Sequence, residues 1–247
     1  MEKPREENLD KTVVKSYLNQ AKALDLSVVM PCLNEETTVG LSVNDAMKFM
    51  EKNSIKGEVI VVDNGSEDNS AKIAAAQGAI VISESRRGYG RALRTGFENA
   101  KGKVVIMGDC DTTYDFLNMK IMYQLLQKES YDMVIGNRYS GGIEKGAMPW
   151  SHRWGVKLLS FLGRRKFKVN IYDFHCGIRG FKKQALDKLE LKTDGMEFAT
   201  ELIAEASRKG LAIKEIPVPL KKCELKRESK LRTIRDGLRH LIYIIKA

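Results

Sequence analysis

The feature that most constrains the fold of this chain is a regular alternation of short β-branched runs with longer helix-like segments. The β-branched runs have the length of strands and lie at 26–31, 58–63, 78–83, 103–109 and 131–136. Helix-like segments follow at 36–52, 67–77, 89–101 and 116–129. This alternation is typical of α/β proteins, in which helices cover a mostly parallel sheet. We therefore predict one α/β domain with a mostly parallel central sheet flanked by helices.

The second half of the sequence is less regular. A loop at 140–150 precedes a basic, apolar helix, and the C-terminal stretch is amphipathic, with basic residues between the apolar ones. The expected helices are 152–165 and 197–209, and the expected strands are 176–181 and 211–218. We predict three regions: a polar lead-in over 1–25 with a short helix from Val13 to Leu24, a domain over 26–228, and a basic amphipathic helix over 229–247.

The net charge of +10 is concentrated in two patches of the C-terminal half. His152 to Lys168 contains six Lys and Arg residues and no acidic residue, and Leu220 to Ala247 contains nine against three acidic residues. Basic patches attract phosphates, which nucleotides, lipid headgroups and nucleic acids all carry. A nucleic-acid-binding protein is disfavoured, because aromatic residues make up only 7% of the chain and no recognition-helix or RNA-binding motif is present.

The sequence carries no signal for membrane insertion or secretion, which predicts a cytosolic protein. No apolar run approaches the roughly 18 residues of a membrane-spanning helix. The N-terminus is polar where a signal peptide would be apolar. The four cysteines are far apart and form no CxxC pair, so we assign them to packing rather than to zinc or disulfides.

Acidic motifs stand at the ends of three predicted strands: PCLNEE (31–36), DNGSEDNS (63–70) and GDCDTTYD (108–115). Ligands of open α/β sheets bind outside the carboxyl ends of the strands, so these motifs are expected to share one site. Asp109 and Asp111 are close enough to bind one divalent cation, which would neutralise a nucleotide diphosphate leaving group. Asp63 can accept hydrogen bonds from a base, although Ser66 and Asp68 are equally typical of a helix N-cap.

A basic, glycine-rich turn opens the helix predicted over 89–101. It lies in SRRGYGRALRTGFENA (85–100), and the N-terminus of a helix is a natural place for phosphate groups. Leu93 stands where a dinucleotide-binding fingerprint has its third glycine, so a nicotinamide enzyme is disfavoured.

Taken in order, the motifs resemble those of family 2 glycosyltransferases of the GT-A fold, and among them the dolichyl- or undecaprenyl-phosphate sugar synthases. The resemblance covers about residues 25–245 and rests on PCLNEE, DNGSEDNS, GYGRALRTGF, GDCDTTYD, GNR, DFHCGIRGF, GMEFATE and RESKLRTIRDGLRHL. It implies a metal-dependent enzyme, with a GT-A domain over 26–228, that transfers a hexose from a nucleotide diphosphate sugar to a polyprenyl phosphate at a membrane surface.

The resemblance also implies roles for individual residues. Together with the turn residues, the nucleotide-sugar site would comprise Pro31, Asn34, Glu35, Asp63, Gly65, Ser66, Gly90, Arg91 and Asp109. Asp109 and Asp111 would bind Mg²⁺ or Mn²⁺. The acceptor and phosphate site would comprise Arg138, Arg227, Ser229 and Lys230. His152 and Arg153 could also contact the acceptor phosphate, although they fit a solvated helix start equally well. Asp173 and Glu197 match acidic positions on the acceptor side, and with Arg138 they form the expected catalytic set.

Three departures from the family pattern bear on these roles. The second motif reads DNGS where many relatives have two aspartates, so Asn64 is expected to alter metal or base contacts. The loop that would close over the phosphates lacks the usual glycine before ESKL. Many relatives continue into transmembrane helices, whereas this sequence stops at IYIIKA, either as a peripheral enzyme or as part of a longer one.

The expected reaction is a direct displacement that inverts the anomeric carbon. A polyprenyl phosphate is already anionic and needs no strong base, so the enzyme would act by positioning and charge stabilisation. A hydroxyl acceptor, as in cell-wall or polysaccharide synthesis, would need a carboxylate base, for which we prefer Asp173 over Glu197. Each also has a structural interpretation, Asp173 as a loop cap and Glu197 as a first-turn acid of its helix.

The motifs leave the donor sugar and the partners open. We prefer UDP-glucose over GDP-mannose as the donor, and a homodimer is compatible with the sequence. A nucleotidyltransferase is disfavoured, because no glycine-rich triphosphate loop lies near the first strand. The C-terminal basic helix would lie in the headgroup layer of an anionic membrane, making the enzyme peripheral on the cytoplasmic face, or would pack on its own domain. We expect His175 to serve packing rather than metal binding.

Overall fold

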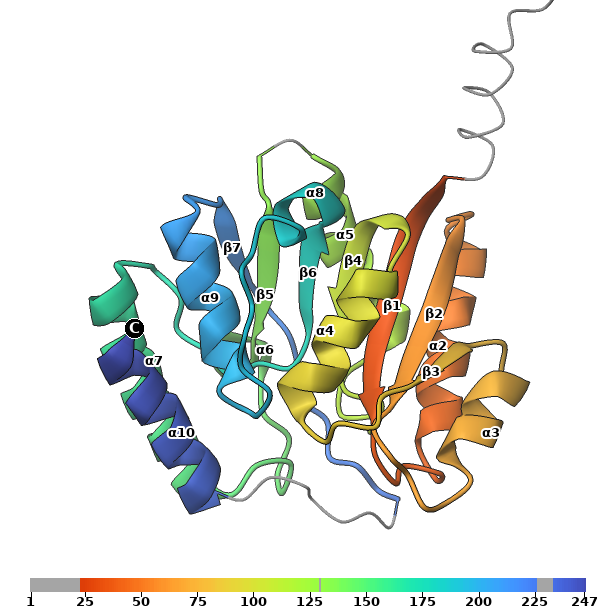
Figure 1. Cartoon of the computed structure of the whole chain (residues 1–247), viewed down its shortest axis with the longest axis horizontal. Helices are drawn as coiled ribbons and strands as arrows, with labels where there is room; N and C mark the ends of the chain where they lie inside the picture. The colour runs from red at the N-terminus through yellow and green to blue at the C-terminus, as the bar shows by residue number, and fades with distance from the viewer. Residues whose placement is uncertain (1–22, 129, 226–232) are drawn as a thin grey trace, which may run out of the picture.

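The computed structural model describes residues 23–128, 130–225 and 233–247, and within them the chain forms a seven-stranded sheet (Figure 1). The strand order is β3-β2-β1-β4-β6-β5-β7, with β6 antiparallel to both of its neighbours and the other pairs parallel. The strands are β1 (Leu24–Cys32), β2 (Gly57–Asp63), β3 (Ile80–Ser83), β4 (Gly102–Met107), β5 (Met133–Asn137), β6 (Arg179–Lys182) and β7 (Ile213–Pro217). The predicted α/β class and mostly parallel sheet are confirmed.

Helices cover both faces of this sheet (Figure 1). One face carries α4 (Tyr89–Asn99) and α9 (Phe198–Arg208), which contact each other. The other face carries α2 (Val39–Lys52), α3 (Ser70–Ala76), the 3₁₀ helix η1 (Phe116–Asn118) and α5 (Lys120–Gln127). The helices α7 (Trp150–Phe167) and α10 (Thr233–Lys246) pack on α9 as an outer layer. Two single-turn helices, α6 (Arg138–Gly141) and α8 (Lys183–Leu186), were not predicted.

The predicted elements differ from the observed ones mainly at their ends, for local reasons. The strand predicted over 103–109 ends at Met107, where the turn that carries the metal motif begins. The strand predicted over 176–181 begins only at Arg179, and the N–H of Gly177 before it donates to the hydroxyl of Tyr114 over 2.8 Å. The short helix expected from Val13 lies almost entirely outside the described residues, and its last residue, Leu24, begins β1 instead.

A close contact between α4 and β1 positions the basic turn at the edge of the sheet. β1 is central in the core, and Val28, Val29 and Met30 are fully buried. Gly96 of α4 lies directly over this strand, because a Cβ at that position would come within 2.3 Å of Val29 Cγ1. Since a glycine is the residue that permits this approach, the N-terminus of α4 is held next to the carboxyl ends of β1 and β2.

The outer helix α10 buries polar residues and Ile244 against the domain and leaves most of its apolar residues exposed. Asp236 and His240 are buried, whereas Ile234 and Leu238 are exposed. The helix therefore packs on its own domain, as one of the two expected arrangements has it, yet its apolar face stays uncovered. Among the described residues, no helix has both the length and the apolar character needed to cross a membrane.

Arg179 at the start of β6 is a fully buried arginine that ties two parts of the acceptor side together. Its guanidinium donates to the carbonyls of Phe174 and Cys176, over 2.6 and 2.9 Å, and to the carbonyl of Ala199 in α9 over 2.6 Å. The loop before β6 and the first turn of α9 therefore share one donor group.

We expect Arg179→Met to lower the free energy of unfolding by about 3 kcal/mol, because it leaves three buried carbonyls without their donor. Urea denaturation followed by circular dichroism measures this change. Lys183→Met is the control, because Lys183 pairs with Asp187 at the surface and its loss is expected to cost less than about 0.5 kcal/mol. Equal effects of the two substitutions would contradict the bracing role of Arg179.

Candidate active site

The loops after β1, β2, β4 and β5 leave the sheet at the same edge. Cys32 at the end of β1 pairs with Asp63 at the end of β2, and Val29 pairs with Met107, the last residue of β4. β6 runs in the opposite direction, so the DFHCG segment before it enters the sheet at this edge as well. The strand ends thereby bring together Asp63, Asp109, Asp111, Arg138 and Asp173.

Asn34 and Ser66, both predicted to bind the nucleotide sugar, connect the loops after β1 and β2. The N–H of Asn34 donates to Ser66 Oγ over 2.9 Å, and Asn34 Oδ1 accepts the N–H of Glu67 over 2.8 Å. The N–H of Ser66 in turn donates to Asp63 Oδ1 over 3.2 Å, and the N–H of Glu35 donates to a serine of α3. These bonds fix the shape of both loops, and contact with a nucleoside stays a prediction.

Pro31 and Gly65 contribute backbone groups to the same edge. The carbonyl of Pro31 accepts a hydrogen bond from the thiol of Cys110 over 3.2 Å, which joins the end of β1 to the metal motif. Gly65 has a φ of +85°, and its carbonyl accepts a hydrogen bond from the exposed guanidinium of Arg87 over 3.0 Å. The sequence analysis did not single out Arg87, although its place in the basic turn was a signal for it.

Asn64 is the residue that holds the basic turn in place. Its amide nitrogen donates to the carbonyls of Glu84 and Arg86, each over 2.9 Å, and its amide oxygen accepts the N–H of Gly88 over 2.7 Å. The side chain is buried and all three bonds go to the turn. An aspartate here would face two carbonyls with an oxygen. These bonds give the amide a structural role, and the expectation that Asn64 alters metal or base contacts stays a prediction.

Gly90 and Arg91, predicted to bind the nucleotide sugar, are both in contact with other parts of the domain. A Cβ at Gly90 would come within 2.6 Å of the carbonyl of Thr193, so α4 begins directly against that loop. Arg91 Nε pairs with Glu84 Oε2 over 3.0 Å. The N–H of Arg86 is the first of several hydrogen bonds that lower the pKa of Glu84. Arg91 thus anchors the turn, and its contact with a phosphate stays a prediction.

Asp109 and Asp111, the predicted metal ligands, are held by different neighbours. Asp111 Oδ1 accepts the N–H of Thr113 over 3.0 Å. Asp109 lies against Gly177, where a Cβ would come within 2.4 Å of Asp109 Oδ2, and it forms a hydrogen bond with the hydroxyl of Tyr89. Within residues 23–128, 130–225 and 233–247, no group of three or more His, Cys, Asp or Glu side chains could hold a metal ion. Two carboxylates fit Mg²⁺ or Mn²⁺, which keep waters and bind substrate phosphates as further ligands.

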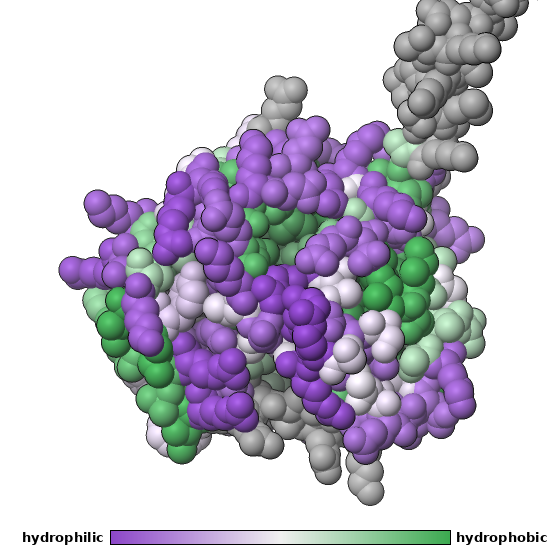
Figure 2. Space-filling view, in the orientation of Figure 1, coloured by the Kyte–Doolittle hydropathy of each residue, from purple (hydrophilic) through white to green (hydrophobic). Residues whose placement is uncertain are grey.

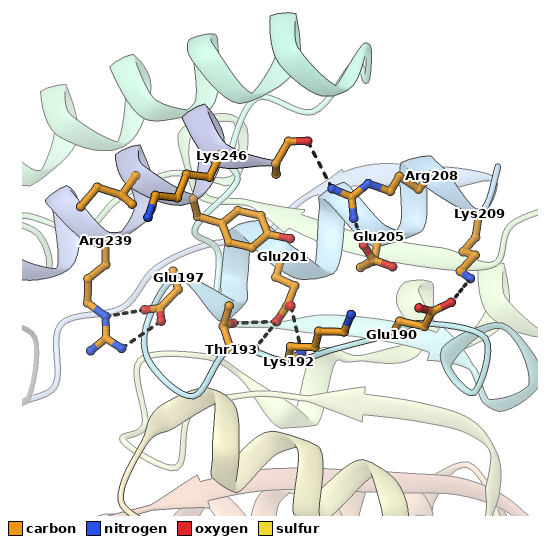
Figure 3. Close-up of a pocket in the computed structure, with 13 residues that line it drawn as sticks. Glu190, Lys192, Thr193, Glu197, Glu201, Glu205, Arg208, Lys209, Arg239 and Lys246 are labelled. Atoms are coloured by element: carbon orange, nitrogen blue, oxygen red, sulfur yellow. Dashed lines mark hydrogen bonds and ion pairs between the residues drawn. The ribbon is translucent and has the colours of Figure 1, made fainter.

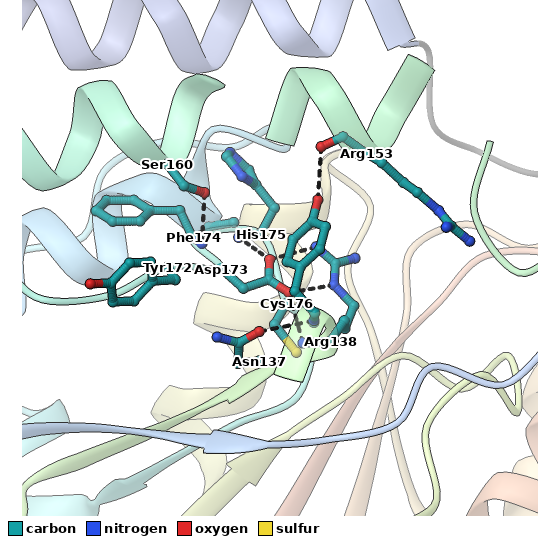
Figure 4. Close-up of polar contacts among 12 residues, drawn as sticks. Asn137, Arg138, Arg153, Ser160, Tyr172, Asp173, Phe174, His175 and Cys176 are labelled. Carbon is teal, nitrogen blue, oxygen red and sulfur yellow. Dashed lines mark hydrogen bonds and ion pairs between the residues drawn. The ribbon is translucent and has the colours of Figure 1, made fainter. Parts of the chain in front are cut away.

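Arg138 and Asp173 form a buried, two-pronged ion pair (Figure 4). Arg138 Nε and Nη2 each donate to one oxygen of Asp173 over 2.7 Å, and the N–H of Arg138 donates to Oδ2 over 3.1 Å. Asp173 is completely buried, and its Oδ1 also accepts the N–H of His175 over 3.3 Å. In this arrangement Asp173 orients Arg138 rather than offering a carboxylate to an acceptor. These contacts agree with the interpretation of Asp173 as a loop cap.

Glu197 at the start of α9 has an arginine partner of the same kind. Arg239 of α10 approaches both of its carboxylate oxygens, over 2.7 and 2.9 Å. Gly195 lies beneath this pair, because a Cβ there would come within 2.4 Å of the Arg239 guanidinium carbon. From the sequence, Arg239 belongs to the basic residues of the last helix, and nothing in the local pattern indicates its partner.

The remaining predicted acceptor residues lie on α7 or outside the described residues. His152 is near Arg138: burial first, and then the charge of Arg138, lowers the pKa of His152. Arg153 contributes its carbonyl, which accepts a hydrogen bond from the hydroxyl of Tyr139 over 3.0 Å (Figure 4). The side chains of Arg227, Ser229 and Lys230 lie outside the residues that the structure describes.

A cavity of about 660 Å³ lies between α9, α10 and the loop that precedes α9 (Figure 3). Glu197 stands at one end with its partner Arg239, and Glu205 pairs with Arg208 and Lys209 with Glu190 elsewhere in the lining. None of the strand-end residues predicted to bind the donor lines it. We interpret it as the polar seam along which α10 meets the domain.

The comparisons with known proteins agree with this geometry. The model of the family described as Glycosyl transferase family 2 matches residues 27–190, which include the motifs after β1, β2, β4 and β5. The chain belongs to glycosyltransferase family 2.

Relatives of this family 2 glycosyltransferase include hexosyltransferases of archaea and yeast. Low-salt glycan biosynthesis hexosyltransferase Agl6 of Haloferax volcanii is 38% identical over 89% of this chain and 53% of its own length, so the chain spans about half of that relative. Dolichyl-phosphate hexose transferase of the same organism is 31% identical over 86% of this chain and 89% of its own length. Dolichyl-phosphate beta-glucosyltransferase of Saccharomyces cerevisiae is 30% identical over 78% and 66%.

The solved structures most usefully compared are those of glucosyl-3-phosphoglycerate synthase from Mycobacterium tuberculosis. Its complex with Mn²⁺, UDP-glucose and phosphoglyceric acid has a TM-score of 0.70 and 24% identity, over 99% of this chain and 84% of that one. At this identity the likeness concerns the fold alone, and it confirms the predicted GT-A fold. A nucleotidyltransferase is thereby set aside in favour of a glycosyltransferase.

A pair of histidines lies under the acceptor side of this glycosyltransferase. The rings of His175 and His240 meet edge to face with centroids 4.2 Å apart, and His240 Nδ1 is 2.8 Å from the hydroxyl of Thr200. Burial lowers the pKa of both rings. For His240, the charges of Arg179 and Arg239 add to burial, and its pKa is about 3. For His175, the neighbouring ring and nearby arginines act in the same direction on its pKa.

We expect Asn64→Asp to lower the free energy of unfolding by roughly 2 kcal/mol and to weaken binding of a nucleotide diphosphate, because two carbonyls of the basic turn lose their donor. Urea denaturation and isothermal titration with UDP measure the two effects. Asn99→Asp is the matched control, since the exposed Asn99 amide also donates to a carbonyl, that of Thr95 over 2.8 Å. Unchanged stability and binding in Asn64→Asp would contradict the role given to the amide.

The histidine pair predicts a loss of stability in mild acid. The pKa of His240 is about 3 in the folded chain, against an ordinary value of 6.5, so the unfolded chain binds more protons between these values. Stability is therefore complete above pH 6.5 and falls below it, by up to about 1.4 kcal/mol per pH unit for each histidine. Denaturation midpoints between pH 7 and 4.5 measure the slope. His240→Leu is expected to flatten it and His152→Gln to change it less; equal slopes in all three proteins would refute the assignment.

Proposed function

We propose that this glycosyltransferase transfers a hexose from a nucleotide diphosphate sugar to a polyprenyl phosphate, by direct displacement with inversion of the anomeric carbon. The names of two relatives support a lipid phosphate as acceptor, since they are dolichyl-phosphate hexose and dolichyl-phosphate beta-glucosyl transferases. UDP-glucose is our preferred donor over GDP-mannose, and the complexes of glucosyl-3-phosphoglycerate synthase with UDP-glucose support that preference.

The observation that carries the proposal is that both candidate base carboxylates are already engaged by arginines. Asp173 pairs with Arg138, and Glu197 pairs with Arg239, each through two oxygens. Each carboxylate is therefore already occupied by a guanidinium group, and neither is offered to an incoming hydroxyl. A hydroxyl acceptor would require a base, whereas a phosphate oxygen is already nucleophilic. The pairing therefore favours an acceptor that arrives as an anion.

Asp109 and Asp111 are the residues that would hold Mg²⁺ or Mn²⁺. Both are carboxylates at the end of β4, and hard oxygen ligands of this kind suit either ion. When bound, the ion would supply charge neutralisation for the leaving diphosphate. Tyr89 and Gly177 orient Asp109, and Thr113 orients Asp111, so the chain prearranges both carboxylates.

The remaining residues act by position and charge. A phosphate oxygen of the acceptor forms the new bond to the anomeric carbon while the bond to the donor diphosphate breaks on the opposite side. Arg138, oriented by Asp173, stabilises phosphate charge on the acceptor side. Asn34 and Asp63 shape the nucleoside side through the loops after β1 and β2. No residue needs to remove a proton during this step.

We place the enzyme at the cytoplasmic face of a membrane as a peripheral protein. A polyprenyl chain keeps its phosphate at the bilayer surface, so an enzyme that uses it must come to that surface. The uncovered apolar face of α10, with Arg235 and Lys246 on the same helix, supports such attachment.

Replacing both Asp109 and Asp111 by Ala is expected to reduce transfer by about 1,000-fold or more, since the leaving diphosphate loses its charge stabilisation. The assay combines UDP-glucose and GDP-mannose, Mn²⁺ and a short, water-soluble polyprenyl phosphate, and measures glycolipid and released nucleotide diphosphate. Asp115→Ala is the control, because Asp115 lies in the same loop but pairs with Lys221. Wild-type protein that makes no glycolipid but glycosylates a hydroxyl acceptor would overturn the proposal.

Asp173→Asn and Arg138→Gln are each expected to reduce transfer about 100-fold, and the double variant is expected to lose little more than either alone. The reason is that the two side chains act as one unit. Steady-state kinetics of the four proteins across pH 5.5–8 measure this coupling. Losses that multiply in the double variant, with a carboxylate step in the pH profile that Asp173→Asn removes, would instead identify Asp173 as a base.

A further inference from the structure

The helices α7 and α10 lie side by side on the outside of the molecule (Figure 1). Each leaves a row of apolar side chains exposed. We call these rows the α7–α10 face; they comprise Trp150, Trp154, Leu158 and Phe161 on α7, and Ile234, Leu238, Ile242 and Ile245 on α10. All are exposed, Trp150 at 76% and Ile234 at 81%. Figure 2 shows the hydrophobic surface that gathers over α10.

The spacing of these residues distinguishes the face from apolar residues that are exposed singly on a protein surface. Neighbours in each row are three or four positions apart, so each row follows one side of its helix. Single exposed apolar residues are normal on a soluble protein, but contiguous apolar surface of this kind marks an interaction site. On α10, Arg239 and His240 make the polar contacts with the domain, to Glu197 and Thr200, which leaves the apolar side for another partner.

The charges beside the face favour an anionic partner. α7 carries no acidic residue, and its cations stand next to the apolar row: Lys157 Nζ is 6.0 Å from the centre of the Trp154 ring, and the Arg165 guanidinium is 5.1 Å from that of Phe161. Tryptophan with neighbouring Lys and Arg is the combination typical of helices that lie in a headgroup layer. An anionic bilayer offers both an apolar interior for these apolar side chains and negatively charged headgroups for the neighbouring cations.

We propose that the α7–α10 face is a lipid-docking surface, on which both helices, and not α10 alone, enter the headgroup layer of an anionic membrane. This inference rests on the proposed function, since a lipid acceptor gives it its purpose. α7 is the new element: the same helix that carries Trp150 and Trp154 outward holds the acceptor side inward. The Arg153 carbonyl accepts from Tyr139 over 3.0 Å, and Ser160 Oγ accepts the N–H of Phe174 over 3.1 Å.

This double contact explains how docking would serve the reaction. Tyr139 follows Arg138, and Phe174 follows Asp173, so α7 is bonded on both sides of the buried ion pair. A bilayer that meets the outer side of α7 therefore lies one helix away from the acceptor residues.

The two tryptophans of the chain, Trp150 and Trp154, both belong to this face, so intrinsic fluorescence reports on it directly. The protein is titrated with vesicles of phosphatidylcholine alone or with about 30% phosphatidylserine, a composition chosen to resemble an anionic leaflet. We expect a blue shift with the anionic vesicles that weakens as salt is raised, and quenching by lipids brominated on their acyl chains. No shift and no quenching with anionic vesicles would overturn the proposal.

Flotation of variants tests the two rows separately. Trp150→Ser with Trp154→Ser, and Ile234→Ser with Ile242→Ser, are each expected to weaken vesicle binding by at least about tenfold, since large apolar side chains leave the lipid. Leu41→Ser with Ile121→Ser is the matched control, because these residues are exposed at 51% and 63% on α2 and α5. Full vesicle binding by the tryptophan variant would refute the part assigned to α7.

Two further measurements separate this inference from the proposed function. Transfer to a short, water-soluble polyprenyl phosphate is expected to survive in the tryptophan variant, while transfer to a long-chain acceptor in vesicles is lost. Transfer to the short acceptor by a wild-type protein that ignores vesicles would sink the docking surface and leave the function standing. Sedimentation that shows a dimer dispersed by the same Trp150 and Trp154 substitutions would assign the face to a second copy and equally overturn the proposal.

Discussion

The buried ion pair between Arg138 and Asp173 is the interaction on which the acceptor side depends. It joins the end of β5 to the segment that leads into β6. β6 is the strand that runs antiparallel to both of its neighbours in the sheet. A charge without a partner in such a place would be strongly destabilising, so each group is held by the other. The pair therefore fixes both the loop and the direction in which the arginine presents its charge.

The same logic extends across the site, where carboxylates position cations instead of moving protons. Glu84 holds Arg91, Asp173 holds Arg138, and Glu197 holds Arg239. In each pair, the arginine and its acid lie in different structural elements or in different turns. Guanidinium groups that are already fixed in place need little reorganisation when an anionic substrate group arrives.

The sequence predicted the α/β fold well because strands and helices follow from local patterns. β-branched runs define β1, β2 and β4, and acids at or just after a strand end, such as Asp63 and Asp109, lie at the edge where the strands end. Their roles toward a donor stay predictions. Ion pairs and hydrogen bonds between residues far apart in the chain leave no comparable pattern in the sequence. Glu197 and Arg239 are 42 positions apart, and nothing around either one indicates the other. Asn64 was taken for a changed ligand because its three partners, in the turn after β3, become visible only in three dimensions.

The amphipathic period of α10 was also readable, but its direction was not. A helical repeat of apolar residues defines a side of the helix without saying whether that side faces the domain. Here Asp236 and His240 are buried, as is Ile244, whereas Ile234, Ile242 and Ile245 are exposed. Thr200 and Glu197 offer the polar partners on the inner side. Periodicity shows that the two sides of a helix differ in polarity. Which side is buried depends on the residues of the elements that the helix packs against.

The contribution of Arg239 has a consequence for how the protein is made. Synthesis proceeds from the N-terminus, so the loops after β1, β2 and β4 are complete and able to fold long before α10 leaves the ribosome. Until then Glu197 at the start of α9 lacks its arginine partner. The strand-end loops are thus able to take shape early in synthesis, whereas the start of α9 is completed only with translation of the last helix described here.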